Sequence, residues 1–136
     1  MSYLNNPVVY LQDSDFDASG NLQNDMLTNK MVLVMMQSNF CGHCTRAKPE
    51  FQKLGEEIAQ SPVASDVVTA TIQADGSEPG ESELGQRLTS ILPSFKGFPT
   101  YVLFWKGKPI GEINSGRDAA SLKQATLDAL ATKSTM

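Results

Sequence analysis

The chain of 136 residues has only two cysteines and one histidine. So few cysteines exclude the disulfide framework that holds many small secreted domains together. No apolar stretch approaches the roughly 20 residues that a membrane-spanning helix needs. Basic residues are also scarce, with 11 Lys and Arg against 15 Asp and Glu, and the net charge is -4. This balance argues against nucleic acid or an anionic membrane surface as the main partner.

The first residues lack the basic segment and the long apolar segment of a secretory signal peptide. We therefore expect a cytoplasmic protein. In a reducing compartment, a lone cysteine pair is more often catalytic or metal-binding than structural. The length and a hydrophobic content of 40% predict one domain over residues 1–136, with a core of about residues 8–132 and a loose end before it.

The two cysteines lie two residues apart, in the segment Cys41-Gly42-His43-Cys44. An apolar run over residues 31–36 precedes them, and a helix is predicted to follow because apolar residues recur at spacings of three and four. The unpaired N–H groups and the dipole at a helix N-terminus favour a thiolate, the form that attacks disulfides. This layout indicates thiol–disulfide exchange.

The remaining pattern predicts an α/β protein whose strands and helices alternate before an antiparallel hairpin near the end. The expected strands cover residues 8–11, 31–37, 67–72, 100–105 and 110–113. The expected helices cover residues 25–29, a stretch after the cysteines through Ile58, residues 83–90 and a last segment capped by Asp118. The first strand is short and is placed at a sheet edge.

This order, with the cysteines opening a helix, resembles the thioredoxin fold, and most closely a catalytic domain of protein disulfide isomerase. Four features over about residues 8–132 carry the resemblance: the inner dipeptide Gly42-His43, Pro49 in the following helix, the segment Gly97-Phe98-Pro99-Thr100, and the segment Gly116-Arg117-Asp118-Ala119. It implies a thioredoxin-like three-layer sandwich with a central mixed sheet of four to five strands flanked by helices.

The resemblance also implies roles for the site residues. Cys41 is the attacking thiolate, Cys44 is the resolving thiol, and His43 between them favours the reduced form and makes the disulfide more oxidising. The reduction potential is about −270 mV for thioredoxin and about −180 mV for protein disulfide isomerase, a gap of roughly 4 kcal/mol. With its Gly-His dipeptide, this chain is expected nearer the oxidising end.

Around the cysteines, the resemblance implies a substrate groove and a modulating cation. Pro99 is expected in the cis form, which exposes the backbone of Phe98 to an extended substrate chain. Phe40 and Phe98 are predicted to form an apolar rim, with Gly97 in the same loop. Arg117 is expected to approach the active site. The implied partners are protein thiols and disulfides and a redox partner, either a reductase or glutathione, with no cofactor.

The chain departs from the family where a proton carrier is usual. An acid normally lies six positions before the first cysteine, and this chain has Met35 there. The lysine that usually pairs with that acid aligns with Thr71, and the usual tryptophan before the first cysteine is Phe40. Losing acid and lysine together avoids an unpaired buried charge. We therefore expect slow turnover, with proton transfer through water or Arg117.

Three other interpretations of the cysteine pair remain. A structural Cys-x-x-Cys disulfide closes too short a loop to stabilise much. A closed zinc site needs four ligands, so only a dimer that shares a metal or an iron–sulfur cluster could complete one. The third is a binding or structural module that keeps the fold with weak or no redox turnover. The acidic segment from Asp75 to Glu83 lacks the alternation of a calcium loop and is predicted to be a solvated loop.

Overall fold

The computed structural model describes residues 4–134, and residues 1–3 of the predicted loose end lie outside that range. One five-stranded sheet has the order β1-β3-β2-β4-β5. Its strands are β1 (Val9–Tyr10), β2 (Met31–Gln37), β3 (Val67–Gln73), β4 (Thr100–Trp105) and β5 (Lys108–Ile113). β1, β3 and β2 run parallel, whereas β4 is antiparallel to both β2 and β5. The expected mixed sheet, with its short first strand at an edge, is confirmed.

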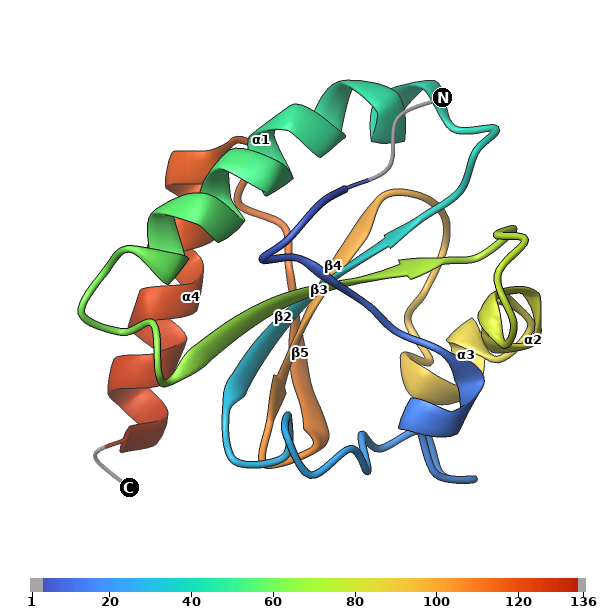
Figure 1. Ribbon diagram of the computed structural model, residues 1–136, viewed down its shortest axis with the longest axis horizontal. Coiled ribbons are helices and arrows are strands. Elements are labelled where there is room, and N and C mark those ends of the chain that lie inside the picture. Colours follow the sequence, from blue (N-terminus) through green and yellow to red (C-terminus); the bar gives the residue numbers. More distant parts are fainter. Residues whose placement is uncertain (1–3, 135–136) are drawn as a thin grey trace.

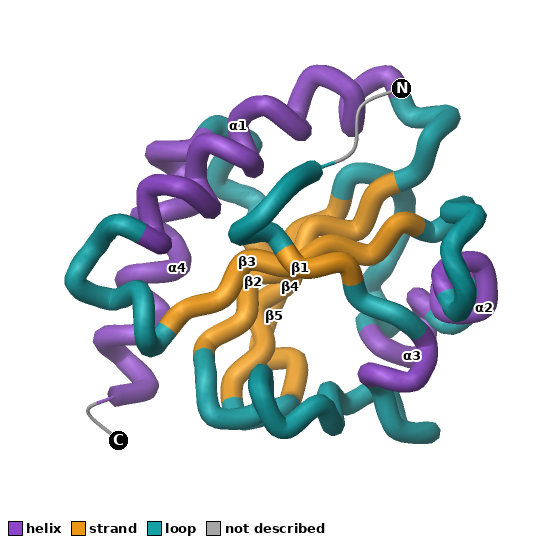
Figure 2. Tube along the Cα trace, in the orientation of Figure 1, coloured by secondary structure: helices purple, strands orange, loops and turns teal. Residues whose placement is uncertain are grey.

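Helices cover both faces of this sheet (Figures 1 and 2). The long helices α1 (Gly42–Ala59) and α4 (Ala119–Ser134) lie against one face. The short helices α2 (Glu81–Gly85) and α3 (Leu88–Ile91) lie on the other, together with the 3-10 helix η1 (Asp13–Asp15). The three-layer thioredoxin-like sandwich is confirmed. Within residues 4–134, no helix has the length and apolar character to cross a membrane.

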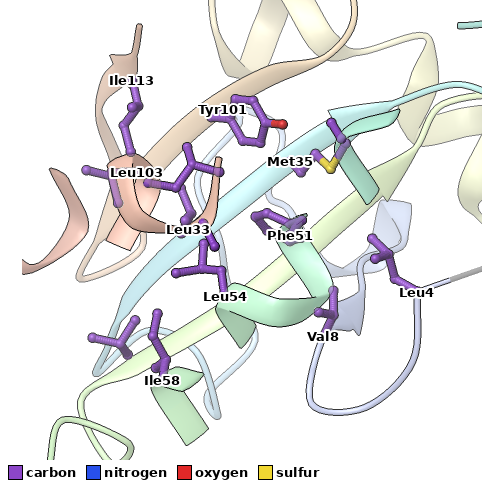
Figure 3. Close-up of a cluster of buried hydrophobic side chains, with 14 of the residues drawn as sticks. Leu4, Val8, Leu33, Met35, Phe51, Leu54, Ile58, Tyr101, Leu103 and Ile113 are labelled. Atoms are coloured by element: carbon purple, nitrogen blue, oxygen red, sulfur yellow. The ribbon is translucent and has the colours of Figure 1, made fainter. Parts of the chain in front are cut away.

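The pleat of the strands divides the core into two clusters, since successive side chains point to opposite faces. Every residue of the central strand β2 is buried, as its apolar run predicts. Met31, Leu33 and Met35 pack toward α1 and α4, and Figure 3 shows Leu33 and Met35 near Phe51 and Leu54 of α1. Val32, Val34 and Met36 pack toward α2 and α3. Because β2 ends where the cysteine loop begins, this central strand fixes the position of the site.

The hairpin between β4 and β5 is tighter than the sequence suggested. Trp105 pairs directly with Lys108, so the turn consists of Lys106 and Gly107 alone. Both have positive φ values, 52° and 84°, as in a two-residue hairpin turn whose twist matches that of the flanking strands. β5 therefore begins at Lys108 rather than at residue 110, and the proline at position 109 is tolerated because β5 is an edge strand.

Three expected elements are corrected. Residues 25–29 form turns instead of a helix: the N–H groups of Leu27 and Thr28 donate to the Asn24 carbonyl, but no further turn follows because β2 begins at Met31. The helix expected over 83–90 is two helices that break at residues 86–87, where the Arg87 side chain turns to Asp13 at 2.7 Å. The loose end is shorter than predicted, because Leu4 is buried in the core.

Candidate active site

Cys41 is the N-cap of α1. Its backbone is extended, and its Sγ accepts a hydrogen bond from the backbone N–H of Cys44 at 3.0 Å. The side chain is half-buried, so a substrate sulfur can reach it. An N-cap sulfur faces the free N–H groups of the first helical turn, which suits the development of negative charge. The predicted position at a helix N-terminus is confirmed.

Cys44 lies one turn inside the helix and is fully buried. Burial raises the pKa of the Cys44 thiol to about 12, and the hydrogen bond and charge of Cys41 act in the same direction. A backbone hydrogen bond from Ser38 and the positive charge of Lys48 oppose this rise in pKa. Both cysteines are free thiols. At neutral pH Cys44 keeps its proton, so it becomes a nucleophile only when another group takes that proton away.

His43 is exposed next to Gly42 in the first turn of α1. Arg46 Nη2 lies 2.7 Å from His43 Nδ1. Since a guanidinium can only donate, Nδ1 is the acceptor, which corresponds to the imidazole tautomer with its proton on Nε2. Of these two side chains Arg46 therefore carries the positive charge, and His43 holds it beside the Cys-x-x-Cys turn. Arg46 belongs to none of the motifs from which the site was predicted.

The loop before Cys41 is held by polar contacts. The Asn39 N–H lies 2.9 and 3.0 Å from the two carboxylate oxygens of Asp75. Gln73 Nε2 donates to Asn39 Oδ1 at 2.9 Å and to Asp75 Oδ1 at 3.0 Å. These three residues, here called the polar clamp, join the ends of β2 and β3. Asn39, two positions before the first cysteine, thus ties the cysteine loop to the end of β3.

The acidic segment is therefore more structured than the predicted solvated loop. Asp75 belongs to the polar clamp, and Glu81 is buried with its carboxylate accepting the Glu78 N–H at 3.1 Å. Burial raises the pKa of Glu81. The parallel ladder of β2 and β3 brings their ends together, which places the start of this segment next to the cysteine loop. Nothing in its acidic spacing alone indicated this role.

The loop before β4 has the predicted backbone, because the Phe98–Pro99 peptide bond is cis. Pro99 is buried, Gly97 is exposed, and the Thr100 hydroxyl donates to the Gly97 carbonyl. Phe98 is half-buried and meets Phe95 edge-to-face, with ring centroids 5.1 Å apart. Phe40, beside the first cysteine, is 95% exposed. An exposed large aromatic ring next to a reactive thiol is a ready contact for an apolar partner.

Arg117 is exposed in the loop between β5 and α4. It lines one pocket of about 160 Å³ with Pro99 and Tyr101. It also lines a second pocket of about 250 Å³ with His43 and Glu50. The structure thus brings Arg117 between the cysteine helix and the cis-proline loop, as the resemblance implies. Asp118 caps α4 by accepting the Ser121 N–H at 3.0 Å, which fixes the end of this loop.

No ionisable group occupies the position under the cysteines where the family usually has an acid. Met35 is fully buried there. The Thr71 hydroxyl donates to the Met35 carbonyl at 2.7 Å and accepts from Gln37 Nε2 at 2.8 Å. The acid and the lysine that the family usually has at positions 35 and 71 are both absent, and a neutral hydrogen bond between Thr71 and Gln37 is present instead. Directly across the ladder from Met35 is Tyr101, a residue that strand periodicity alone predicts as ordinary core.

The fold and this site place the chain in a class of proteins with a redox-type cysteine pair on a thioredoxin-like sandwich. The thioredoxin family model matches residues 7–128, and the chain belongs to the thioredoxin family. It is 49% identical over 114 residues to the thioredoxin-like protein 453L of invertebrate iridescent virus 6, covering 79% of this chain and 83% of that protein. It is 32% identical over 96 residues to the protein disulfide-isomerase of Drosophila melanogaster, covering 69% of this chain and 16% of that protein.

Solved structures show the same fold. Human ERp44 (form I) superimposes with a TM-score of 0.70 at 21% identity, over 93% of this chain and 30% of that chain. The J-Trx1 fragment of ERdj5 superimposes with a TM-score of 0.61 at 17% identity, over 90% of this chain and 51% of that chain. The present chain thus corresponds to a part of these longer proteins, as it does for the Drosophila relative.

Proposed function

We propose that the protein is a thiol–disulfide oxidoreductase that exchanges disulfides with protein substrates through Cys41 and Cys44. The observation that carries this proposal is the asymmetry of the pair. Cys41 is accessible at the helix N-terminus, whereas Cys44 is buried with its pKa raised to about 12 by that burial. One thiol suited to attack and one protected thiol within the same turn are what a two-step exchange requires.

In the reductive direction, the Cys41 thiolate attacks a substrate disulfide. A bond forms between Cys41 Sγ and one substrate sulfur, and the other substrate sulfur leaves as a thiolate that takes a proton from water. Cys44 then loses its proton and attacks Cys41 Sγ, which breaks the mixed disulfide and releases the second substrate thiolate. The substrate gains two electrons, and the Cys41–Cys44 pair loses two.

The other residues of the site have positioning roles in this proposal. Phe40 and Phe98 provide apolar contact for the substrate chain, and the backbone beside Pro99 and Gly97 pairs with it as an added strand. Arg46 places a positive charge near the cysteine turn, and His43 holds the guanidinium there through its Nδ1. Gly42 adds no side chain at the entrance to Cys41, and its surroundings are open. Glutathione or a reductase renews the pair.

Insulin reduction measured by the precipitation of its separated chains tests the proposal. We expect Cys41→Ser to abolish the rate. Cys44→Ser is expected to stop turnover too, but to accumulate a mixed disulfide with insulin that dithiothreitol releases. Thr45→Ala, which changes an exposed residue of the same turn, serves as the control and should keep activity. A rate that is independent of Cys41 would contradict the proposal and favour a binding module that only keeps the fold.

A further inference from the structure

Arg46 does not form the ion pair that its position on α1 allows. Glu50 follows it by four residues, a spacing at which opposite charges on a helix attract each other. Instead, Arg46 Nη2 lies 2.7 Å from His43 Nδ1, in the direction of the helix N-terminus. The other terminal nitrogen, Nη1, lies 3.8 Å from the position that a Cβ on Gly42 would take. The guanidinium therefore lies over the first turn of α1, beside the inner dipeptide of the cysteine pair.

The carboxylates near Arg46 are bound to α4 instead. Glu50 Oε1 accepts the Ala119 N–H at 2.8 Å, and Asp118 Oδ2 accepts the Ser121 N–H at 3.0 Å. Both N–H groups belong to the first turn of α4, where the helix dipole favours negative charge. The two acids thus hold the start of α4, and part of their charge is balanced there.

Arg117 lines the same pocket as Arg46, a cavity of about 250 Å³ between the start of α1 and the loop before α4. Glu50 and Asp118 also line it. Within residues 4–134 neither arginine forms an ion pair, and the Arg117 side chain has no hydrogen-bond partner. The pocket, here called the arginine pocket, therefore combines two guanidinium groups that still have donors to offer with two carboxylates that are already bound.

The arginine pocket suits a carboxylate through direct contact rather than through long-range attraction. The chain as a whole has a net charge of -4, so it does not attract anions from a distance. At short range, the planar fork of a guanidinium matches the two oxygens of a carboxylate. A basic side chain would instead meet two arginines, and it could gain a full ion pair only by drawing Glu50 or Asp118 away from α4.

We propose that Arg46 and Arg117 bind the carboxylate of an Asp or Glu side chain close to the substrate cysteine, and so select acidic segments among protein disulfides. This specificity rests on the proposed function, because the segment is held while Cys41 attacks its sulfur. His43 is a positioning residue that holds Arg46 through Nδ1. Arg117 connects the arginine pocket to the substrate groove, because it also lines the pocket of about 490 Å³ that contains Pro99.

Two capped pentapeptides with a central cysteine test this selection, one with Glu and the other with Gln on both sides of the cysteine. Each is joined through its cysteine to 2-thiopyridine, which is the better leaving group. Reduced Cys41 then bonds to the peptide sulfur and releases pyridine-2-thione, which stopped-flow absorbance follows. Each rate is divided by the rate of the same peptide with the neutral thiol dithiothreitol. We expect the wild type to favour the Glu peptide about 5-fold, at the upper end for exposed ion pairs.

Arg46→Gln and Arg117→Gln should each lower this ratio to about 2, and the double variant to about 1. Because the ratio compares two peptides on one protein, it cancels any change in the reactivity of Cys41 and reports recognition alone. Lys53→Gln is the matched control, since it removes one positive charge from an exposed position of α1 outside the arginine pocket. It should keep the ratio of the wild type.

A wild-type ratio near 1 would overturn the carboxylate site, and so would a ratio that both arginine variants leave unchanged. An equal fall of the ratio in Lys53→Gln would overturn it too, because net charge alone would then explain the preference. If neither peptide releases pyridine-2-thione in a reaction that depends on Cys41, the proposed function is overturned, and the selection of acidic segments with it.

Discussion

The two faces of the sheet are built from the same strands, yet only one carries chemistry. The cluster toward α2 and α3 consists of aliphatic and aromatic side chains, as around the fully buried Phe104. The cluster toward α1 and α4 is equally well buried but includes Cys44 and Tyr101. The comparison shows that a redox site needs no separate scaffold. The site occupies one end of the face toward α1 and α4, where β2 ends and α1 begins.

The difference between the faces is sharpest at two phenylalanines, both fully buried. Phe51 lies two helical turns from Cys44 and 6.0 Å from the Tyr101 ring, whereas Phe104 meets Phe16 at 5.9 Å. Replacing either by Ala should lower the free energy of unfolding by about 3–5 kcal/mol, measured by urea unfolding. Only Phe51→Ala opens space beside the buried thiol, so iodoacetamide should label Cys44 several-fold faster in that variant. Equal labelling rates in the two variants would show that the faces do not differ in this way.

Alkaline pH provides the next test, because Cys44 is a buried thiol that can lose its proton on the face toward α1 and α4. The pKa of its thiol is about 12 in the folded protein and 9.0 without the protein's influence. The Cys44 thiol ionises at a lower pH in the unfolded chain than in the folded protein. Its contribution to the free energy of unfolding is therefore fully present below pH 9 and is lost as the pH rises toward 12. Between pH 8 and 10 the reduced wild type should lose about 1.4 kcal/mol more than Cys44→Ala. Parallel pH profiles for the two proteins would contradict the raised pKa.

The polar clamp lies at the ends of β2 and β3 beside the cysteine loop, so its removal tests this end of the sheet and not the interior of the core. Asp75→Ala removes the acceptor of the Asn39 N–H and of Gln73 Nε2. We expect a loss of about 1 kcal/mol in the free energy of unfolding, together with a slower reaction of Cys41 with 5,5′-dithiobis(2-nitrobenzoic acid), followed by stopped-flow absorbance. Asp25→Ala, at an exposed turn, should change stability by less than about 0.5 kcal/mol. An unchanged rate of this reaction in Asp75→Ala would show that the clamp does not position Cys41.

The smallest effect on stability is expected at Tyr101. Its hydroxyl is buried without a hydrogen-bond partner among residues 4–134, so Tyr101→Phe should raise the free energy of unfolding by up to about 1 kcal/mol. Tyr10→Phe, which removes a hydrogen-bonded hydroxyl, should have the opposite effect on stability. Thermal and urea unfolding of the two variants measure this. A marked loss of stability in Tyr101→Phe would mean that the hydroxyl has a structural partner in solution.

The helices and strands with a strong apolar pattern could be predicted from the sequence, and so could the site residues that lie close together in the chain. The central strand, the helix after the cysteines and the cap at Asp118 depend on neighbours in the chain, and all three are confirmed. The helix expected over residues 25–29 is wrong because β2 begins at Met31, which leaves room for a single hydrogen-bonded turn after Asn24. The cytoplasmic location stays a prediction.

Other features of the site could not be read from the chain because they depend on register. Asp75 meets Asn39 only through the β2–β3 ladder, and Tyr101 meets Met35 only through the β2–β4 ladder. The residues in each pair are dozens of positions apart in sequence, and neither pair belongs to a motif. The missing acid at Met35 was visible in the sequence, but the hydroxyl opposite it was not.

The central claim is that Cys41 and Cys44 form one reversible redox pair, and a redox titration tests it most directly. The protein is equilibrated with mixtures of reduced and oxidised glutathione, quenched with acid, and its free thiols are counted by mass spectrometry. The account predicts a single two-electron transition between about −270 and −180 mV, nearer the second value. If no internal disulfide forms at any glutathione ratio, or if each cysteine is only glutathionylated on its own, the account is wrong.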